Sequence, residues 1–533
     1  MGLQMTGPAR HWFLLFLLLL SISGATVHFA FGYSHRDLSG HAWGTDDAYI
    51  TYRYAQNLVG GHGLVYNPNE RVEGYSNFLM VLLSAAFLLL YPNGIYTACF
   101  VFSTACFVVM VLIFYFYLGR KVNMRLAQFG ALTLCLCPVM WIWPGSGLET
   151  SAVLLAQVAL FTTVEYMVIR DSAKSTALFC FLTLCLILLR ADGFVFPLLC
   201  TVVFLLKRQY RYWVRSLAFV VVSAGLFVVC RYFYYGDVLP NSYYVKVSGG
   251  LLQRIPEATL TLARSCRDDA FFLYLVPLAF CWYTSCREQF RRRVLSREVS
   301  TSISVVSFGL LAYWMYIGGD TFEERFLLVL IPLSILSLIT LDMGVLLSKR
   351  RLNIILIVMV LQFLPFVRDL RFDYHLHKYD RWVELGRFLA QEHPDATLAI
   401  DAAGKVPFCS RLYTIDMLGL NDKYIGHKPA SFFKAGHNKY DADYVLNRHP
   451  DLISAWGKGD LDLSWGMSRD RYKRAGYVLK YAVNTSAEKK AKNIVDVSGM
   501  NEAEIGVLFC EGYEYFVITR EVPKSKTEGM ITQ

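Results

Sequence analysis

The stretch GTDDAYITYRYAQNLVGGHGLVYNPNERVEGYSN, residues 44–77, separates the first two long apolar segments of this 533-residue chain. It combines two adjacent carboxylates with several tyrosines and glycines. Hydrophobic residues make up 55% of the chain, charged residues only 18%, and the mean hydropathy is +0.38. Such values, with repeated apolar runs, are typical of proteins that cross a membrane several times. The polar stretch is therefore expected on one face of a membrane protein, close to the lipid.

Apolar segments that can cross or nearly cross a bilayer recur over the first two thirds of the chain. They lie at roughly 11–31, 76–91, 95–118, 125–143, 148–168, 175–190, 194–206, 216–235, 271–285, 301–317, 326–347 and 353–367. The first is interpreted as an uncleaved helix rather than a signal peptide. The second is short and ends at YPNG, which breaks helices, so we expect it to be re-entrant. Residues 1–367 are thus predicted to form a membrane core with about eleven spans and one re-entrant segment.

The loops between these segments are of two kinds. GRKVNMR, KRQYRYWVR, CREQFRRRVLSR and SKRR are basic, whereas GSGLET, RADG, YYGDVLPNSYYVK and GGDTFEERF are acidic or polar. Because basic loops tend to remain in the cytosol, the second set and the first loop, 33–75, are predicted to face the other side. Orientation and lipid head groups account for the net charge of +10, so no nucleic-acid partner is expected.

The composition changes after about residue 368. YDRWVELGRFLAQEHP has helical periodicity, and ATLAID and EYFVITREV have the pattern of strands. Residues 368–522 are therefore predicted to form a soluble α/β domain outside the membrane, followed by a disordered tail at 523–533. The predicted fold class is a polytopic α-helical membrane protein with a C-terminal soluble α/β domain.

Asp46 and Asp47 begin a predicted helix, and this has two interpretations. In the structural one, the carboxylates stabilise the positive end of the helix and one of them is its N-cap. In the functional one, a carboxylate at a partly dehydrated interface has a raised proton affinity and acts as a general base toward a sugar hydroxyl. Tyr49 and Arg53 on the same short helix favour the second. The following GGHGLVYNP lacks the lysine of a nucleotide-binding loop and is interpreted as a turn.

Other polar loops on the predicted outer face also contain charged residues. A single loop charge is usually just solvated, but ionisable groups gathered at membrane depth usually mark a substrate path. Arg53, Lys246 and Arg325 are candidates for binding an anionic phosphate, which guanidinium groups hold bidentately. Further candidates are Glu73, Tyr75, Glu149, Asp192, Asp237 and Asp320.

The block DDAYITYRYAQNLVGGHGLVYNPNERVEGYSNFL resembles a signature of integral-membrane glycosyltransferases of the GT-C type, and most of all bacterial arabinofuranosyltransferases. GLET, RADG, GDVLPNSYYVK, GGDTFEERF, TIDMLGLND and GHNKYDADYVLNRHPDLI are similar to later blocks of that family in the same order. GGDTFEERF departs from the bulkier form that the family often has between the Asp and the Arg. The resemblance implies inverting transfer of a sugar, arabinofuranose above all, from polyprenyl phosphate to a glycan or protein acceptor. It also implies a bacterial inner membrane with the site on the periplasmic face.

The resemblance further implies roles for single residues. Asp46 or Asp47 would be the base, with Asp46 preferred, and Lys246 and Arg325 would steady the lipid phosphate. The residues expected to bind substrate are Tyr49, Arg53, Glu73, Tyr75, Glu149, Asp192, Asp237, Asn241, Lys246, Asp320, Arg325 and His437. Asp416, His437 and Lys439 are expected where the soluble domain meets the membrane core. Some GT-C enzymes need a divalent cation; no certain cofactor or ligand set can be read here, so a metal is left open.

Two other functions fit the same pattern. A transporter or flippase for a lipid-linked sugar would use the buried charges without a base at an acceptor site. A non-enzymatic envelope assembly factor would use the soluble domain to bind a partner. Substitution of Asp46 and Asp47 separates these functions from transfer, because only transfer needs the carboxylate as a base.

Overall fold

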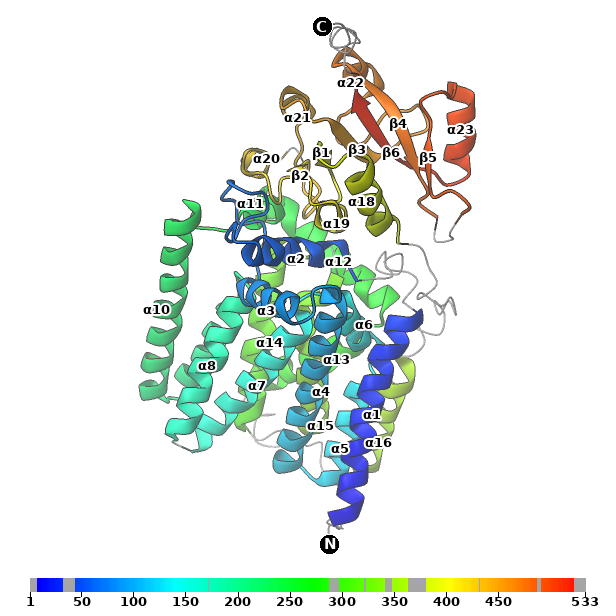
Figure 1. Cartoon of the computed structure of the whole chain (residues 1–533). Helices are drawn as coiled ribbons and strands as arrows, with labels where there is room; N and C mark the ends of the chain where they lie inside the picture. Colours follow the sequence, from blue (N-terminus) through cyan, green and yellow to red (C-terminus); the bar gives the residue numbers. More distant parts are fainter. Residues whose placement is uncertain are drawn as a thin grey trace, which may run out of the picture.

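The computed structural model describes residues 7–31, 44–170, 172–286, 297–320, 323–340, 348–362, 380–430, 432–486 and 490–521. They form a helical bundle with a sheet-containing domain at one end (Figure 1). The bundle and the segments at its end comprise α1 (Gly7–Phe31), α2 (Asp46–Val59), α3 (Phe78–Leu90), α4 (Ile95–Lys121), α5 (Met124–Cys135), α6 (Pro138–Ser146), α7 (Thr150–Ile169), α8 (Ala173–Leu189), α9 (Val195–Leu206), α10 (Tyr210–Tyr235), α11 (Asn241–Lys246), α12 (Leu251–Asp268), α13 (Phe272–Cys286), α14 (Arg297–Ile317), η2 (Glu323–Leu327), α15 (Leu330–Thr340) and α16 (Ser348–Leu361). The predicted tail at 523–533 lies outside the described residues.

Several of these helices have the length and composition of membrane spans. Within the described part of the chain, four meet both criteria, namely α4, α7, α10 and residues Val299–Ile317 of α14. The bent pair α5 and α6, with 54° between its halves, would add a fifth. Shorter apolar helices lie at His11–Val27, Phe78–Leu90, Ala173–Leu189, Val195–Leu206, Phe272–Ser285 and Leu330–Ile339. The predicted apolar segments are thus helices, while the number of full spans stays a prediction.

The outer surface of the bundle is apolar. α10 leaves Val222, Leu226 and Phe233 exposed, with 68%, 62% and 79% of their surfaces accessible. A row of exposed apolar side chains this large is unfavourable in water and favourable against lipid tails. The exposed face of α10 is therefore the face that meets the membrane.

α3 is shorter than a span. Its 13 residues rise about 20 Å, against about 30 Å for the hydrocarbon core. It ends at Leu90, immediately before YPNG, and it packs against α2. This length fits the predicted partial insertion of residues 76–91, which otherwise stays a prediction.

The C-terminal domain is built on a mixed sheet. Among the described residues it has six strands in the order β2-β1-β3-β6-β4-β5. These are β1 (Thr397–Ile400), β2 (Tyr413–Asp416), β3 (Leu452–Trp456), β4 (Tyr477–Val483), β5 (Ile494–Asp496) and β6 (Tyr515–Arg520). β1 is parallel to β2 and β3, and the other pairs are antiparallel. The strands predicted at ATLAID and EYFVITREV are β1 and β6.

Helices cover both faces of this sheet. They are α18 (Arg381–Glu392), α19 (Lys405–Ser410), α20 (Lys423–His427), α21 (Ala442–Asn447), α22 (Arg469–Arg474) and α23 (Glu502–Cys510). Alternation along β1 explains the two cores: Leu398 and Ile400 share a cluster with Leu385 of α18, whereas Ala399 belongs to a cluster with Val445 of α21. The domain is therefore the α/β unit predicted from the sequence.

α2 lies across the end of the bundle, beneath the sheet domain (Figure 1). Its Arg53 is buried and donates to the carbonyl oxygens of Pro407 and Leu412 at 2.5 and 2.7 Å. Arg53 also donates to the carbonyl oxygen of Tyr66 at 2.8 Å, and the Tyr66 hydroxyl donates to the Ala403 carbonyl at 2.6 Å. We call this contact, between residues 46–75 and residues 403–421, the seam.

The backbones approach closely at the seam, so glycine is required there. A Cβ placed on Gly404 would lie 1.9 Å from the backbone oxygen of Asp46, and one on Gly74 would lie 1.9 Å from the Oδ1 atom of Asn421. The first contact is with backbone, which cannot move without shifting α2. Any side chain at residue 404 therefore separates the domain from the bundle.

The substitution Gly404→Ala is expected to weaken the seam. Forcing a methyl group into a packed contact costs about 1–3 kcal/mol, so we expect a lower Tm and faster proteolysis between bundle and domain. The control is Gly506→Ala in α23, where a Cβ meets nothing within 4 Å and where alanine favours the helix. Equal Tm values for the two variants would contradict the close approach at residue 404.

Candidate active site

Asp46 faces the sheet domain. Its carboxylate oxygens accept the backbone N–H groups of Gly404 and Lys405 at 2.9 and 2.8 Å. Burial raises the pKa of Asp46 to about 6, and the neighbouring Asp47 adds to this effect, although the two N–H groups oppose it. Neither carboxylate is the N-cap, which is Thr45; its hydroxyl donates to the Ser146 carbonyl at 3.1 Å and makes no capping hydrogen bond to the helix. The structural interpretation, in which one of the two acids caps α2, is therefore not what the structure shows; Asp46 instead binds the sheet domain.

Asp47, on a different face of α2, lies close to Lys246 of α11. The Lys246 Nζ atom lies 3.7 Å from a carboxylate oxygen of Asp47, and each side chain is 31% exposed. Two residues far apart in the sequence, both predicted for the site, are thereby brought together. Because both stay partly accessible, this pair can meet a substrate.

A chain of buried polar contacts begins one turn along α2 from Asp47. Thr51, on the same face, donates its hydroxyl to Asn77 at 3.1 Å, and the Asn77 amide donates to Glu149 at 2.8 Å. Arg190 donates to the other oxygen of Glu149 at 3.2 Å. All of these side chains are buried or nearly so. The chain therefore joins α2, the start of α3, the start of α7 and the loop after α8.

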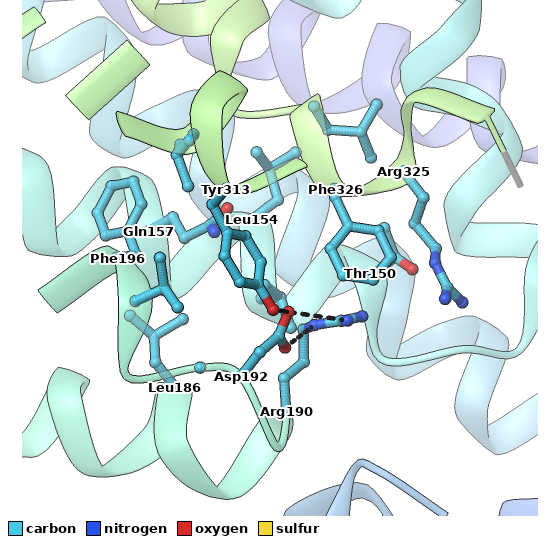
Figure 2. A pocket seen from close by; sticks show the side chains of 15 residues that line it. Thr150, Leu154, Gln157, Leu186, Arg190, Asp192, Phe196, Tyr313, Arg325 and Phe326 are labelled. Carbon is cyan, nitrogen blue, oxygen red and sulfur yellow. Dashed lines mark hydrogen bonds and ion pairs between the residues drawn. The ribbon is translucent and has the colours of Figure 1, made fainter. Parts of the chain in front are cut away.

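The chain of contacts continues to α14. Arg190 donates to Asp192 at 2.8 Å, and the Tyr313 hydroxyl donates to the other oxygen of Asp192 at 2.9 Å (Figure 2). The guanidinium of Arg190 also lies over the Phe326 ring, 3.9 Å from its centroid. These residues and Arg325 line a cavity of about 40 Å³. Ligand pockets are commonly about 300–1,000 Å³, so this small cavity positions groups rather than holding a sugar.

Arg325 is itself held in place. Its guanidinium donates to Asp320 at 2.9 Å, and both side chains are buried. Figure 2 shows the Arg325 side chain beside Phe326 and Thr150 at one end of the same cavity. The predicted residues Glu149, Asp192 and Arg325 are thus gathered at one place, with Asp320 bound to the last of them.

Glu73 and Asn241 lie in a second group near the seam. Arg231 of α10 donates to Glu73 at 2.5 Å, and the backbone N–H of Asn241 donates to the Glu73 carbonyl at 2.9 Å. Burial raises the pKa of Glu73 to about 7, against the opposing effect of Arg231. The Asn241 amide donates to the carbonyl oxygen of Gly419 at 2.7 Å. This group anchors the polar loops to one another and to the sheet domain.

The two predicted tyrosines are packed among other rings. Tyr49 contacts the Phe408 ring edge to face, with 5.3 Å between centroids. Tyr75 shares a hydrogen bond of 3.0 Å with the hydroxyl of Tyr235. Both tyrosines are at least 95% buried, so their surroundings are those of core residues rather than of a sugar platform.

Asp237 lies at the outer edge of this region. It accepts the hydroxyl of Tyr244 at 2.8 Å and lies 3.4 Å from the imidazole of His427 and 3.7 Å from Lys423. The last two belong to α20, so Asp237 links a loop of the bundle to the domain. Among the described residues, these partners of Asp237 are distinct from the group at Arg190.

The three residues predicted at the junction are all in the sheet domain. Asp416 folds its own loop by accepting the backbone N–H groups of Leu418 and Asn421, and burial raises its pKa to about 6. Lys439 donates to the Gly426 carbonyl at 2.6 Å, and His437 lies 3.2 Å from the Ala435 carbonyl. Near them, Asn438 donates to Ser248 of the bundle at 2.5 Å, so this loop does reach the junction.

Several central residues are not evident from the sequence. Arg190 lies two residues before the predicted Asp192 in RADG. Carboxylates removed from water need a counter-charge, and this arginine was the available signal. Asn77, Arg231 and Tyr313 have no such signal. Arg53, predicted to bind phosphate, instead uses its donors at the seam and is not proposed as a phosphate ligand.

Metal binding was left open by the sequence. In the ranges that the structure describes, no group of three or more His, Cys, Asp and Glu side chains is placed to hold an ion. Asp47 is a partly exposed carboxylate and could contribute one ligand. A metal requirement stays a prediction.

Comparison with known proteins gives sequence and fold relatives. The family described as "Domain of unknown function (DUF8728)" matches residues 369–516. The chain is 27% identical over 375 residues to the terminal β-(1→2)-arabinofuranosyltransferase of Mycobacterium tuberculosis. That match covers 61% of this chain and 56% of the relative, so the chain spans little more than half of the relative's length.

Two solved structures have the same arrangement over most of the chain. ArnT from Cupriavidus metallidurans, solved with undecaprenyl phosphate, superposes with a TM-score of 0.58 at 11% identity and covers 96% of this chain and 98% of its own. The oligosaccharyltransferase of Archaeoglobus fulgidus gives 0.52 at 12% identity, covering 90% and 73%. The chain has the GT-C fold. The GT-C fold and the apolar helices together make it a multi-pass membrane protein, and the predicted fold class is confirmed.

Within the GT-C fold of this chain, Arg190 is the residue on which the buried polar chain depends. In Arg190→Ala, the buried Glu149 and the partly buried Asp192 would lose their shared cation, and breaking a fully buried pair costs about 3–5 kcal/mol. We therefore expect a clearly lower Tm. The control, Arg267→Ala, removes a surface ion pair to Asp268 and should cost about 0–1 kcal/mol. Similar Tm values for both variants would show that Arg190 is not the shared counter-charge.

The raised pKa of Asp46 predicts a pH dependence of the seam. The folded protein holds this proton more tightly than the unfolded chain, so the stabilisation is full below about pH 4 and is lost as the pH rises through about 6. The Tm difference between the wild type and Asp46→Asn should decline over this range. Other groups, such as Asp416, titrate in both proteins and cancel in the difference. Parallel Tm profiles would contradict the burial of Asp46.

Proposed function

We propose that this chain is an inverting membrane glycosyltransferase that moves a sugar from a polyprenyl phosphate to a glycan or protein acceptor. Arabinofuranose is the proposed sugar, because the M. tuberculosis relative is named for its transfer. The donor class is supported by the GT-C fold shared with ArnT, which was solved with undecaprenyl phosphate. The observation that carries the proposal is the contact of Asp47 with Lys246 beside the buried polar chain.

Asp47 is proposed as the general base, in place of Asp46, which the family resemblance had favoured. Both oxygens of Asp46 already accept backbone N–H groups of the sheet domain. Asp47 has one ionic partner at 3.7 Å and keeps 31% of its side chain accessible. A base must reach the proton that it removes, and the accessible carboxylate is the one that an acceptor hydroxyl can approach.

The reaction needs one deprotonation and a stabilised leaving group. The acceptor oxygen would attack the anomeric carbon while the bond from that carbon to the phosphate oxygen breaks, and Asp47 would take the hydroxyl proton. The electron pair of the broken bond stays on the polyprenyl phosphate. Because a phosphate is a good leaving group, no nucleotide is required, and attack from the opposite face inverts the anomeric carbon.

Lys246 and Arg325 are proposed to act on the phosphate. Lys246 supplies an accessible ammonium beside the base, and Arg325 supplies a guanidinium at the end of the small cavity. The chain from Thr51 to Asp192 would then fix these parts relative to one another, because its members come from α2, α7 and the loop after α8. Preorganised groups lower the barrier without having to reorient during the reaction.

The proposed location is the outer face of a bacterial inner membrane. Two of the loops predicted to be cytosolic, GRKVNMR and KRQYRYWVR, lie at the end of the bundle away from the sheet domain, where α4 ends at Lys121 and α10 begins at Tyr210 (Figure 1). The sheet domain, α2 and Asp47 then lie on the periplasmic side. This is the side on which a polyprenyl-linked sugar would meet a cell-envelope acceptor.

The substitution Asp47→Asn tests the base. We expect it to lower the transfer rate about 100- to 10,000-fold, the range for loss of general base catalysis, while Tm stays near that of the wild type. The assay uses the purified full chain, a polyprenyl-phosphate-linked arabinofuranose and an arabinan oligosaccharide, each with and without a chelator. Asp443→Asn, a change of the same kind at a side chain 68% exposed in the sheet domain, is the control and should keep full activity.

Two results would overturn parts of this proposal. Full activity of Asp47→Asn together with loss of activity in a folded Asp46→Asn would return the base to Asp46. No transfer by the wild type, with movement of the lipid-linked sugar between leaflets instead, would favour the flippase. Mass spectrometry of surface glycans from cells with and without the gene identifies the sugar. We expect a pentose to be missing from the glycans of cells that lack the gene.

A further inference from the structure

A second cavity lies far from Asp47, at the other end of the bundle. It has a volume of about 810 Å³ and opens between the ends of α4 and α7 and the start of α8. α7 begins beside Glu149, at the candidate site, and its 20 residues rise about 30 Å before it ends at Ile169, on this cavity. The two sites are therefore separated by about the thickness of the membrane core.

The lining of this cavity is strongly basic. Its charged residues are Arg120, Lys121, Glu165, Arg170 and Lys174. Among the described residues that line the cavity, the carboxylate is Glu165, and it is already bound by Lys207 at 2.8 Å, by Lys121 at 3.3 Å and by the hydroxyl of Ser302 at 2.5 Å. An excess of positive charge is left facing the opening.

Three of these cations are free to bind an anion. Within the described part of the chain, Arg120, Arg170 and Lys174 have exposed side chains and no ion pair or side-chain hydrogen bond. The hydroxyl of Tyr117, which also lines the cavity, is buried and has no hydrogen-bond partner there. A buried hydroxyl without a partner is costly, so a ligand oxygen at this point would be favourable.

The walls of the cavity are apolar and face outward. Phe116, Ile169 and Leu178 line it and are 37%, 58% and 45% exposed. A basic floor next to apolar side chains that meet lipid matches a molecule with an anionic head and hydrocarbon tails. A free phosphate would use the cations only, and it would leave the apolar wall uncovered.

We propose that this cavity binds an anionic phospholipid of the cytosolic leaflet. Its phosphate would be held by Arg120, Arg170 and Lys174, and its acyl chains would lie along the apolar wall. Basic pockets between membrane helices on the cytosolic side commonly bind such head groups. The bound lipid would join α4, α7 and α8, and it stabilises the bundle whether or not the chain transfers a sugar.

Native mass spectrometry of the full-length protein in detergent tests the binding. We expect phosphatidylglycerol to remain bound, phosphatidylcholine not to remain bound, and Tm to rise only with the first. Retention should fall as the salt concentration rises, because the contacts with the head group are ionic.

The variant Arg170→Gln with Lys174→Gln removes two of the three cations. Each cation near an anionic lipid contributes about 1 kcal/mol, so affinity for phosphatidylglycerol should fall about 30-fold. The matched control is Arg125→Gln with Arg215→Gln, which removes two exposed cations at the same end of the bundle but outside the cavity. If the double variant does not fold, Arg120→Gln gives the same comparison with a smaller effect.

Three results would overturn the proposal. One is equal retention of phosphatidylglycerol by the cavity variant and the wild type. Another is an equal loss in the cavity and control variants, which would indicate a general surface charge effect. The third is a rise of Tm with inorganic phosphate equal to that with phosphatidylglycerol, which would indicate an anion site without a lipid.

Discussion

The buried guanidinium of Arg53 is the constraint on which the rest of the structure depends. A charged side chain removed from water must find partners, and Arg53 finds the carbonyl oxygens of Tyr66, Pro407 and Leu412. One of these lies in the first polar loop and the other two belong to the sheet domain. The guanidinium therefore fixes α2, its following loop and the domain in a single arrangement. The place of Asp47, on the same helix as Arg53, follows from that arrangement.

α2 has two polar faces with different tasks. One face, with Asp46 and Arg53, is occupied by the sheet domain, and the other carries Asp47 and Thr51 toward the bundle. The adjacent acids of the opening motif are thus separated by less than one turn of helix. Both oxygens of Asp46 accept backbone N–H groups of the sheet domain, whereas Asp47 keeps 31% of its side chain accessible. A rigid, closed contact on one side holds a reactive carboxylate in place on the other, as a preorganised site requires.

Local patterns made part of this structure predictable. Apolar runs predicted the bundle helices. The short apolar runs in ATLAID and EYFVITREV predicted two strands, which are largely buried in the sheet. The resemblance of the opening block pointed to the GT-C fold and to the acids of α2. What could not be predicted were contacts across long sequence separations. Arg53 meets residues more than 350 positions away. Arg190 meets Glu149, 41 residues earlier, and Asp192 meets Tyr313, 121 residues later. Nothing local distinguishes such an arginine from one that faces a ligand.

The close fit of Gly74 against Asn421 and of Gly404 against Asp46 has an evolutionary consequence. Residues 46–75 and residues 403–421 fit together so closely that a larger side chain on one side would clash with the other. Substitutions on one side therefore need matching substitutions on the other. Recombination that joined the C-terminal domain of one relative to the membrane part of another would be tolerated only if residues 44–77 came from the same parent as the domain. The first polar loop is thus inherited with a domain that begins some 300 residues later, and a chimaera designed at the obvious boundary near residue 368 would cut through this pairing.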